Sequence, residues 1–333
     1  MTIPSVARGL GTVLLLSTSG LFAQESTVAD TVDPDLPVVT SFAFRNALEV
    51  FVSSEGGVYR STNNGDSWAL FTNSVTMGSC TGISFNSKGH VFISSDGNGV
   101  FRSTDQGNTW ERRDTTFKYH QVGSLAINSR DQIFIGDGVN PFVFRSDDDG
   151  VHWSYEPATR DYQYGDITID SKDQLFVYTS AGLLTSTNNG EGWFSFGTRG
   201  MYACNLAVDS LGKAFMGGEY DWVTITTDLG KTWVSARPSK DSLAAVSGLA
   251  IAPEGLIFAA FNSGLVTVSL DGGIHWVDTS IRSYNTYPIV RIAINPFAHV
   301  FVSTKGGGLL RSTDKGKSWR RINRGFVPLE RNE

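Results

Sequence analysis

An eight-residue motif, STDQGNTW where it spans Ser103–Trp110, occurs seven times along the chain at nearly even intervals. Successive closing tryptophans are 40 to 43 residues apart, so the motif marks one supersecondary unit that is copied along the sequence. Each copy starts with Ser or Thr, has Asp or Asn third and Gly fifth, and ends with Trp. The copies span Ser61–Trp68, Ser103–Trp110, Ser146–Trp153, Ser186–Trp193, Thr226–Trp233, Ser269–Trp276 and Ser312–Trp319.

The residues between the motifs have the pattern of short β-strands. In the third repeat, Ser124–Gly138 contains two apolar runs that alternate with period two and are separated by a polar turn. A third short run leads into the motif, and the segment after the tryptophan supplies a fourth strand. Four strands per period of about 42 residues are typical of a propeller blade. The sequence therefore predicts an all-β fold, a seven-bladed β-propeller of four-stranded antiparallel blades.

One position in the first strand of every repeat holds a small residue. In a radial arrangement of sheets the innermost strands lie closest together, so we expect small side chains there. A helical or two-domain fold predicts no such column. The column consists of Ala43, Ser84, Ala126, Thr168, Ala207, Ala250 and Ala293.

The repeats also predict the domain boundaries. We expect a propeller over residues 37–325, with the first and last blades each complete, so that the ring closes by packing of blade faces. Residues 24–36 are acidic and contain proline, which is typical of a flexible leader, and residues 326–333 are expected to form a C-terminal tail. The predicted blades span about 37–74, 78–116, 120–158, 162–198, 202–238, 245–282 and 288–324.

Residues 1–23 have the pattern of a signal peptide. Arg8 precedes an apolar stretch, and the small residue Ala23 precedes Gln24. The alternative is a short buried helix. No later segment approaches the roughly 18 apolar residues that a membrane span needs. We therefore expect a secreted or periplasmic protein without a membrane span.

Charge and composition exclude several kinds of site. The 33 acidic residues outnumber the 27 basic ones, and no basic run occurs that would favour a nucleic-acid partner. Cys80 and Cys204 are too few for a disulfide scaffold, so we expect two buried thiols that are not joined. The five histidines lack the spacing of metal ligands, and we expect neither a metal site nor a cofactor.

The motif itself indicates a structural turn. Asp or Asn can accept hydrogen bonds from N–H groups about two residues on, Gly tolerates positive φ, and Trp packs between strands. Asn63 and Asn188 replace Asp, a change that suits turn bonding but neither a catalytic carboxylate nor a calcium ligand. The run Asp147–Asp149 is contiguous, unlike the alternating ligands of a calcium loop. We assign structural roles to Asn63, Trp68, Asp105, Trp110, Asp148, Trp153, Asn188, Trp193, Asp228, Trp233, Asp271, Trp276, Asp314 and Trp319.

The motif matches the Asp-box, or bacterial neuraminidase repeat, written Ser/Thr-x-Asp-x-Gly-x-x-Trp. The chain resembles Asp-box propellers over nearly all residues after the leader, and its length and single ring are similar to those of photosystem II assembly factor propellers and their bacterial relatives. The resemblance implies that the boxes join third and fourth strands at the periphery of one face. It also implies that ligands bind the other face, around the central channel.

Aromatic and basic residues gather in the segments that the resemblance assigns to this ligand face. Exposed aromatic rings beside cations suit stacking on sugar rings or gripping of carboxylates and peptides. The alternatives are that these side chains pack along their loops, or that Asp166 and Arg291 merely line a solvated channel mouth. We predict ligand contacts at Tyr119, His120, Arg160, Tyr162, Tyr164, Arg199, Tyr202, Tyr220, Trp222, Arg282, Tyr287 and Arg291.

Signals of catalysis are weak. No Arg-Ile-Pro stretch of the sialidase type occurs, and Glu219 and Tyr220 are adjacent, which places their side chains on opposite sides of a strand. Glycoside hydrolysis otherwise needs two carboxylates about 5 to 10 Å apart. The carboxylates that could lie on the ligand face are Glu55, Asp96, Asp137, Asp166 and Glu219, but no spacing pairs any two of them. Asp166 and Glu219 are the candidates for catalysis. We therefore expect a monomeric, non-catalytic binding or assembly propeller that recognises a glycan or a protein at the channel face. The alternative is a sialidase-like glycoside hydrolase.

Overall fold

The computed structural model describes residues 36–54, 56–72, 80–113, 122–137, 142–157, 164–179, 182–196, 203–218, 222–238, 244–281 and 287–327. Within these ranges the regular elements are strands, β1 to β28, with no helix among them. This part of the chain thus contains no helix that could cross a membrane. The predicted signal peptide and residues 24–35 of the predicted leader lie outside the described residues.

The strands form seven separate sheets, each with four antiparallel strands in chain order. Blade 1 contains β1 (Val39–Phe44), β2 (Val50–Ser54), β3 (Gly57–Ser61) and β4 (Ala69–Leu70). Blade 2 contains β5 (Cys80–Phe85), β6 (Val91–Ser95), β7 (Gly99–Ser103) and β8 (Glu111–Arg112). Blade 3 contains β9 (Val122–Ile127), β10 (Ile133–Asp137), β11 (Phe142–Ser146) and β12 (Ser154–Pro157).

The remaining four blades repeat this arrangement. Blade 4 contains β13 (Tyr164–Ile169), β14 (Leu175–Thr179), β15 (Gly182–Ser186) and β16 (Phe194–Phe196). Blade 5 contains β17 (Ala203–Val208), β18 (Ala214–Gly218), β19 (Val223–Thr226) and β20 (Val234–Ala236). Blade 6 contains β21 (Val246–Ile251), β22 (Ile257–Phe261), β23 (Val266–Ser269) and β24 (Val277–Asp278). Blade 7 contains β25 (Ile289–Ile294), β26 (Val300–Thr304), β27 (Gly308–Ser312) and β28 (Arg320–Arg321).

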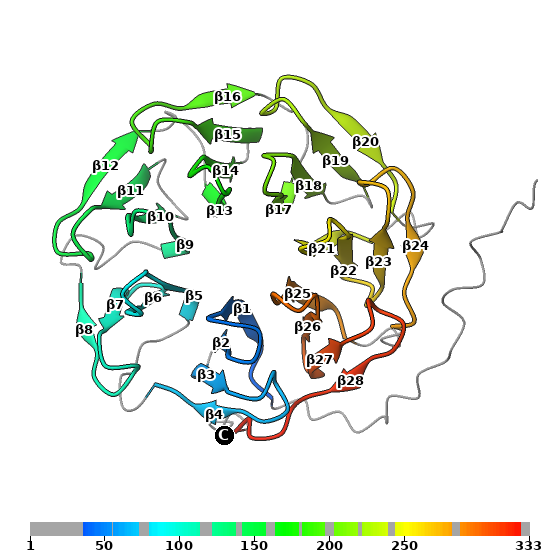
Figure 1. Cartoon of the computed structure of the whole chain (residues 1–333), viewed down its shortest axis with the longest axis horizontal. Coiled ribbons are helices and arrows are strands. Elements are labelled where there is room, and N and C mark those ends of the chain that lie inside the picture. The colour runs from blue at the N-terminus through cyan, green and yellow to red at the C-terminus, as the bar shows by residue number, and fades with distance from the viewer. Residues whose placement is uncertain are drawn as a thin grey trace, which may run out of the picture.

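The sheets stand in a ring around a common axis (Figure 1). The first strand of each blade is innermost, and the fourth strand runs along the outer rim toward the next blade (Figure 1). The predicted seven-bladed all-β propeller is therefore confirmed. Both terminal blades are built from continuous segments, as the sequence predicts, and among the described residues no strand from one terminus completes a sheet at the other.

The core lies between the blades rather than within any one of them. The second strands are buried at every position in most blades, because each sheet is covered on both faces by its neighbours. A fully buried phenylalanine stands second in each of these strands, and its ring packs in the layer between two blades. This column consists of Phe51, Phe92, Phe134, Phe176, Phe215, Phe258 and Phe301.

The strand register gives a specific reason for the small residues of the first strands. Ala43 pairs with Phe51, Ser84 pairs with Phe92, and the other five blades have the same pairing. A small side chain beside each phenylalanine leaves room for its ring, since directly opposite residues have Cβ atoms only about 4.5 to 5.5 Å apart. The column thus marks a cross-strand pair as well as the tapering centre of the ring.

Candidate functional site

The connectivity divides the turns between two faces. Each box follows a third strand, so it lies at the same face as the turn between first and second strands, which we call the box face. Turns between second and third strands, and connections between blades, belong to the opposite face. Most predicted ligand contacts fall in those connections. Tyr119, His120, Arg160, Tyr162, Arg199, Tyr202, Glu219, Tyr220 and Arg282 lie outside the described residues, as do the side chains of Tyr164 and Asp166.

Trp222 and Arg237 form an exposed pair at the opposite-face end of blade 5. The indole is 38% exposed, and the Arg237 guanidinium carbon lies 4.8 Å from its ring centroid. Cation–π contacts at exposed sites contribute about 0.5 to 1 kcal/mol, so the two side chains hold each other in position. The pair offers a flat surface with a positive charge, suited to a carboxylate or to a planar group of a partner.

Tyr287 packs against the turn that joins β26 and β27. A Cβ at Gly306 would lie 3.2 Å from the Tyr287 ring, and a Cβ at Gly307 would lie 3.6 Å from it. The Lys305 N–H donates to the Pro288 carbonyl at 2.9 Å. This turn is therefore held against the start of β25, with the Lys305 side chain exposed beside the half-buried tyrosine.

Arg291 connects blade 7 to blade 1. Each pairing of first and second strands has an irregularity, and Asp166 and Arg291, predicted at the channel mouth, lie at it, as does Asn205 in blade 5. Arg291 Nε donates to the Thr40 carbonyl at 3.0 Å, and Asn205 Nδ2 donates to the Val246 carbonyl at 2.9 Å. These positions therefore link neighbouring first strands, a role that the sequence interpretation did not include.

Threonine hydroxyls make the corresponding links from blade 1 to blade 2 and from blade 2 to blade 3. Thr40 Oγ1 donates to the Cys80 carbonyl and Thr81 Oγ1 to the Val122 carbonyl, both at 2.7 Å. The Cys80 side chain is fully buried beside this link, and burial raises the pKa of its thiol to about 12. A thiol that stays protonated in this way is a poor nucleophile and metal ligand. The side chain of Cys204 lies outside the described residues.

In the boxes, the Ser or Thr and the Asp or Asn side chains accept from backbone N–H groups four residues on, rather than about two residues on as expected for Asp and Asn. In blade 2, Ser103 Oγ accepts from the Gly107 N–H at 2.7 Å and donates to Asp105 Oδ1 at 2.8 Å. Asp105 Oδ1 also accepts from the Thr109 N–H at 2.8 Å. Hydrogen bonds from the side chain and backbone of Thr109 lower the pKa of Asp105 to about 2. In five other blades the hydroxyl of the first box residue likewise accepts from the N–H of the box glycine.

The third box residue bonds to the side chain of the seventh in most boxes, whether the third is Asp or Asn. Where Asp is present, its second oxygen has a side-chain partner, such as the Thr232 hydroxyl at 2.7 Å from Asp228 or His275 Nδ1 at 2.5 Å from Asp271. Asn63 instead donates to Ser67 Oγ, at 2.9 Å. Asn188 faces Gly192, which has no side chain. The pairing follows hydrogen-bond chemistry, because a carboxylate only accepts whereas an amide also donates.

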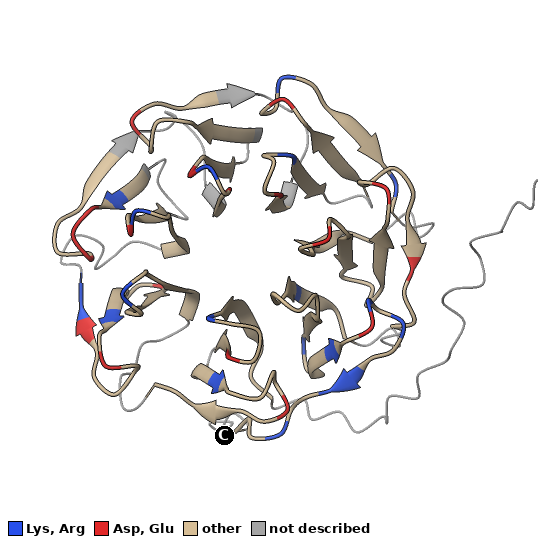
Figure 2. Ribbon diagram, in the orientation of Figure 1, with Lys and Arg blue, Asp and Glu red and all other residues tan. Residues whose placement is uncertain are grey.

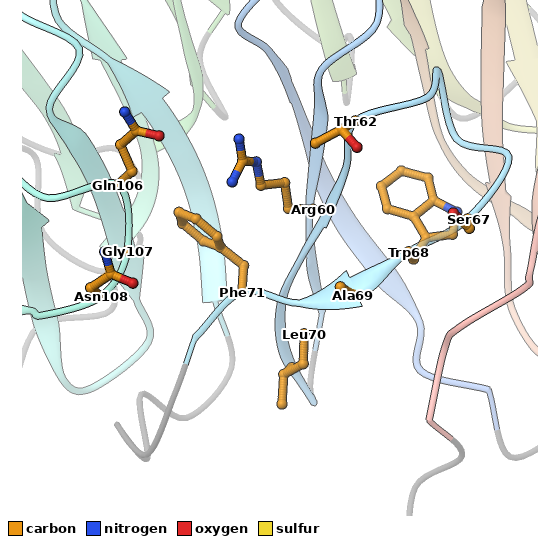
Figure 3. A pocket seen from close by; sticks show the side chains of 10 residues that line it. All are labelled: Arg60, Thr62, Ser67, Trp68, Ala69, Leu70, Phe71, Gln106, Gly107 and Asn108. Atoms are coloured by element: carbon orange, nitrogen blue, oxygen red, sulfur yellow. The ribbon is translucent and has the colours of Figure 1, made fainter.

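The box glycines also touch the neighbouring blade. The Phe71 ring, three residues after the blade 1 tryptophan, lies so close to Gly107 that a Cβ there would overlap it. Ile322 lies under Gly65 and Thr279 under Gly316 in the same way. Figure 3 shows Phe71 and Arg60 of blade 1 pointing toward the blade 2 box across an outer groove of about 330 Å³. Arg60 is bound to Glu49 of the same blade at 2.6 Å, so its side chain is held in place from within blade 1.

A second groove, of about 550 Å³, lies between the first strands of blades 1 and 2 and includes turn residues at the box face. Its walls include Phe42, Phe44 and Phe85, which are half-buried. The Arg45 guanidinium lies 4.7 Å from the Phe85 ring centroid and pairs with Glu49 at 3.3 Å. Because Glu49 also binds Arg60, the groove combines an apolar wall with positive charge at its box-face end.

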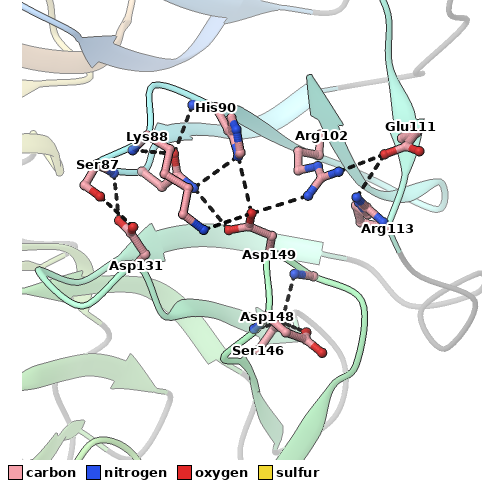
Figure 4. Close-up of polar contacts among 12 residues, drawn as sticks. Ser87, Lys88, His90, Arg102, Glu111, Arg113, Asp131, Ser146, Asp148 and Asp149 are labelled. Carbon is pink, nitrogen blue, oxygen red and sulfur yellow. Dashed lines mark hydrogen bonds and ion pairs between the residues drawn. The ribbon is translucent and has the colours of Figure 1, made fainter. Parts of the chain in front are cut away.

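The acidic run of blade 3 is satisfied by protein groups. Asp149 lies 3.1 Å from Asn86 Nδ2 and within 3.4 Å of Lys88, His90 and Arg102, all from blade 2 (Figure 4). Asp148 closes its box, and Asp147 binds Arg145 at 2.8 Å. No cluster of three or more metal-ligating side chains occurs among the described residues. The three carboxylates thus serve the turn, the strand and the blade interface.

Two features therefore characterise the described surface: an interlocked box face, and an opposite face that carries the stacked Trp222 and Arg237. Residues 13–207 match the family described as photosynthesis system II assembly factor YCF48. The chain belongs to this family. The family expected from the boxes is thereby confirmed, and no curated protein matches in a sequence search.

Solved structures with the same fold include two YCF48 proteins. "YCF48 bound to D1 peptide" has a TM-score of 0.70 and 15% identity, with 84% of this chain and 95% of that chain covered. YCF48 from Cyanidioschyzon merolae has a TM-score of 0.69 and 15% identity, with 85% and 97% covered. These similarities span nearly the whole length of both YCF48 chains.

A glycoside hydrolase shares the fold as well. The GH74 xyloglucanase from Xanthomonas campestris has a TM-score of 0.72 and 16% identity, with 89% of this chain covered. This YCF48-family chain spans 55% of the length of that enzyme. At such identities the similarity concerns the fold alone.

Proposed function

We propose that this YCF48-family chain is a non-catalytic propeller that binds a segment of a partner protein on its opposite face. The observation that carries the proposal is the match to a peptide-bound YCF48 over 84% of this chain and 95% of that one. This chain has a propeller of the same extent as that relative, so it offers a similar scaffold for a peptide. Export of the chain, to the periplasm or the medium, remains part of the proposal.

The chemistry of the described opposite face supports a peptide ligand. The stacked Trp222 and Arg237 combine an apolar surface with a charge that can bind a carboxylate bidentately. Lys305 adds a second exposed cation near Tyr287. The predicted contacts from Tyr119 to Arg282 would extend this surface around the axis. Carbohydrate binding uses the same residue types, so a glycan is the second ligand class to test.

Variants of the stacked pair test this proposal. The full chain is immobilised and probed with a library of short peptides and a glycan panel, and Trp222→Ala and Arg237→Ala are then compared with Leu211→Ala. Leu211 is 80% exposed at the box face, so its variant is the matched control. We expect each opposite-face variant to weaken peptide binding by about five- to tenfold, because truncating an exposed aromatic or arginine anchor costs about 1 kcal/mol or more. Equal binding by all four proteins would reject this placement of the site.

The second candidate function is glycoside hydrolysis, which the xyloglucanase fold similarity favours. Its carboxylates would be Asp166 and Glu219. Incubation with xyloglucan, other β-glucans and sialosides tests it by product release. Release that disappears in Asp166→Asn or Glu219→Gln would establish hydrolysis and overturn the non-catalytic proposal. The absence of release together with peptide binding would support a binding role.

A further inference from the structure

Positive charge is concentrated in the last blade. Residues 287–327 contain eight Lys or Arg and one Asp, a net charge of +7, whereas the whole chain carries −6. The other residues therefore carry −13 in total. Charges of one sign grouped in this way create a local field that attracts segments of the opposite sign.

Five of these residues form what we call the basic rim: Lys315, Lys317, Arg320, Arg321 and Arg324. They lie on β28 and on the turns before and after it, along the outer edge of blade 7 (Figure 2). The Arg320 side chain is 68% exposed, and Lys315, Lys317 and Arg324 are also exposed. Among the described residues, Glu254 and Asp66 supply the acidic partners of the rim, at 3.0 Å from Lys315 and 3.6 Å from Arg320. Most of its positive charge faces solvent.

The polypeptide enters the fold at the seam between blades 1 and 7. Val39, at the start of β1, packs in one buried cluster with Leu309 and Ile322 of blade 7, and Leu36 is buried shortly before it. The segment immediately upstream, residues 24–35, contains Glu25, Asp30, Asp33 and Asp35 and no basic residue. Twelve residues can span up to about 40 Å. The acidic segment is therefore tethered within reach of the basic rim.

We propose that the acidic segment 24–35 binds the basic rim of blade 7 within the same chain. Tethering at this seam gives the segment an effective concentration that reaches about millimolar for short linkers, so a weak electrostatic contact suffices. An acidic segment of a partner would have to displace it, which makes the contact self-inhibitory for this surface. The rim lies at the outer edge rather than on the opposite face, so this inference is independent of the function proposed above.

A peptide supplied in trans tests the contact. A fluorescein-labelled peptide of residues 24–36 is titrated into the full chain and into a full chain whose own segment is neutralised by Glu25→Gln, Asp30→Asn, Asp33→Asn and Asp35→Asn. We expect the neutralised chain to bind the peptide about tenfold more tightly, since its rim has no tethered competitor. The binding should weaken as ionic strength rises from about 0.05 to 0.3 M. Equal affinity for both chains, or no binding by either, overturns the proposal.

Charge reversal locates the site. In the neutralised chain, Lys317→Glu with Arg324→Glu should abolish peptide binding. Lys231→Glu should leave it unchanged, because Lys231 occupies in blade 5 the box position that Lys317 occupies in blade 7. Melting curves verify that each variant is folded, and Lys317→Gln with Arg324→Gln replaces the reversal if it is not.

Two further readouts distinguish other occupants of the rim. Carbodiimide treatment of the unmodified full chain at low salt should link a carboxylate of residues 24–35 to Lys317, detected by mass spectrometry. Binding of phosphatidylglycerol vesicles equally by both chains, without peptide binding, would assign the rim to a membrane surface and overturn the proposal. Failure of the Trp222 and Arg237 variants to alter partner binding would leave these outcomes unaffected.

Discussion

At the scale of single residues, the box glycine has two separate constraints. Gly107 has a φ of 90°, a conformation that other residues adopt at a cost, and the Phe71 ring of the preceding blade occupies the space of its Cβ. Backbone conformation alone explains a glycine in any tight turn. The neighbouring ring explains why this glycine also controls the contact between two blades.

Alanine substitutions separate these two constraints. Gly89 also has a positive φ, 78°, but nothing lies within 4 Å of its Cβ position. We expect Gly89→Ala to lower the free energy of unfolding by about 1 kcal/mol, and Gly107→Ala to lower it by a further 1 to 3 kcal/mol or so, because of overpacking against Phe71. Urea unfolding of both variants measures the difference. Equal losses would show that the ring adapts without cost.

At the scale of the turn element, the boxes that carry Asp are stabilised by an ionised carboxylate. The side-chain and backbone hydrogen bonds of Thr109 lower the pKa of Asp105 to about 2, and those of Thr232 do the same for Asp228. For Asp271, desolvation raises the pKa, but hydrogen bonds from the backbone and side chain of His275 outweigh it and bring the value to about 2. All of these groups bind a proton less readily in the fold than in the unfolded chain.

These shifts predict a stability that falls in acid. A carboxylate whose pKa is lower in the fold contributes fully above its unfolded pKa of about 3.9, and the contribution is lost as the pH falls through 2. We expect the melting temperature to be steady with respect to these groups above pH 5 and to drop between about pH 4 and 2. Thermal scans of the wild type and of Asp105→Asn with Asp228→Asn measure this effect. A slope in the double variant as steep as that of the wild type would contradict the prediction.

At the scale of the whole molecule, the ring is closed by the residues that follow β28. The Trp68 indole donates to the Ile322 carbonyl at 2.7 Å, and the Trp68 N–H donates to the Arg324 carbonyl at 2.9 Å. The Phe326 ring lies 4.7 Å from Tyr59 and 5.4 Å from Trp68, between ring centroids. The start of the predicted tail is thus packed against blade 1, so the first and last blades are joined by a latch as well as by face packing.

Truncation of the latch should weaken the whole ring. We expect Phe326→Ala to lower the free energy of unfolding by about 1 to 2 kcal/mol, because a half-buried aromatic ring and its contacts with two others are lost. Val327→Ala is the control, since Val327 is 58% exposed and its change should cost less than about 0.5 kcal/mol. Calorimetry that shows equal melting of both variants would mean that the face packing of blades 1 and 7 is sufficient.

Much of the fold could be predicted because its evidence is local and repeated. The box spacing, the alternation of the strands and the small first-strand column each occur seven times, so they indicate the blade number and strand order without any partner residue being known. The buried phenylalanine in the second strand of each blade is an equally regular signal, but it was not used in the prediction.

The candidate site was less predictable because its residues differ from repeat to repeat. Trp222 stands out in the sequence as the tryptophan outside the boxes. Its stacking on Arg237, however, depends on the pairing of β19 with β20, which brings the start of one strand beside the end of the other. Arg291 was interpreted as a ligand contact at the channel mouth, whereas its Nε reaches the Thr40 carbonyl of the next blade. A single sequence contains no signal for a hydrogen bond between residues 251 positions apart.

The sequence by itself determined that this chain forms a ring of seven antiparallel blades with a structural turn in each. Only the tertiary structure decided what the variable residues of that ring do. It showed the cations around Asp149, the contacts of the box glycines, the Trp68 latch and the positively charged outer edge of blade 7. The physical reason is distance along the chain, since strands and turns form among neighbours whereas these contacts join blades that are brought together only when the ring closes.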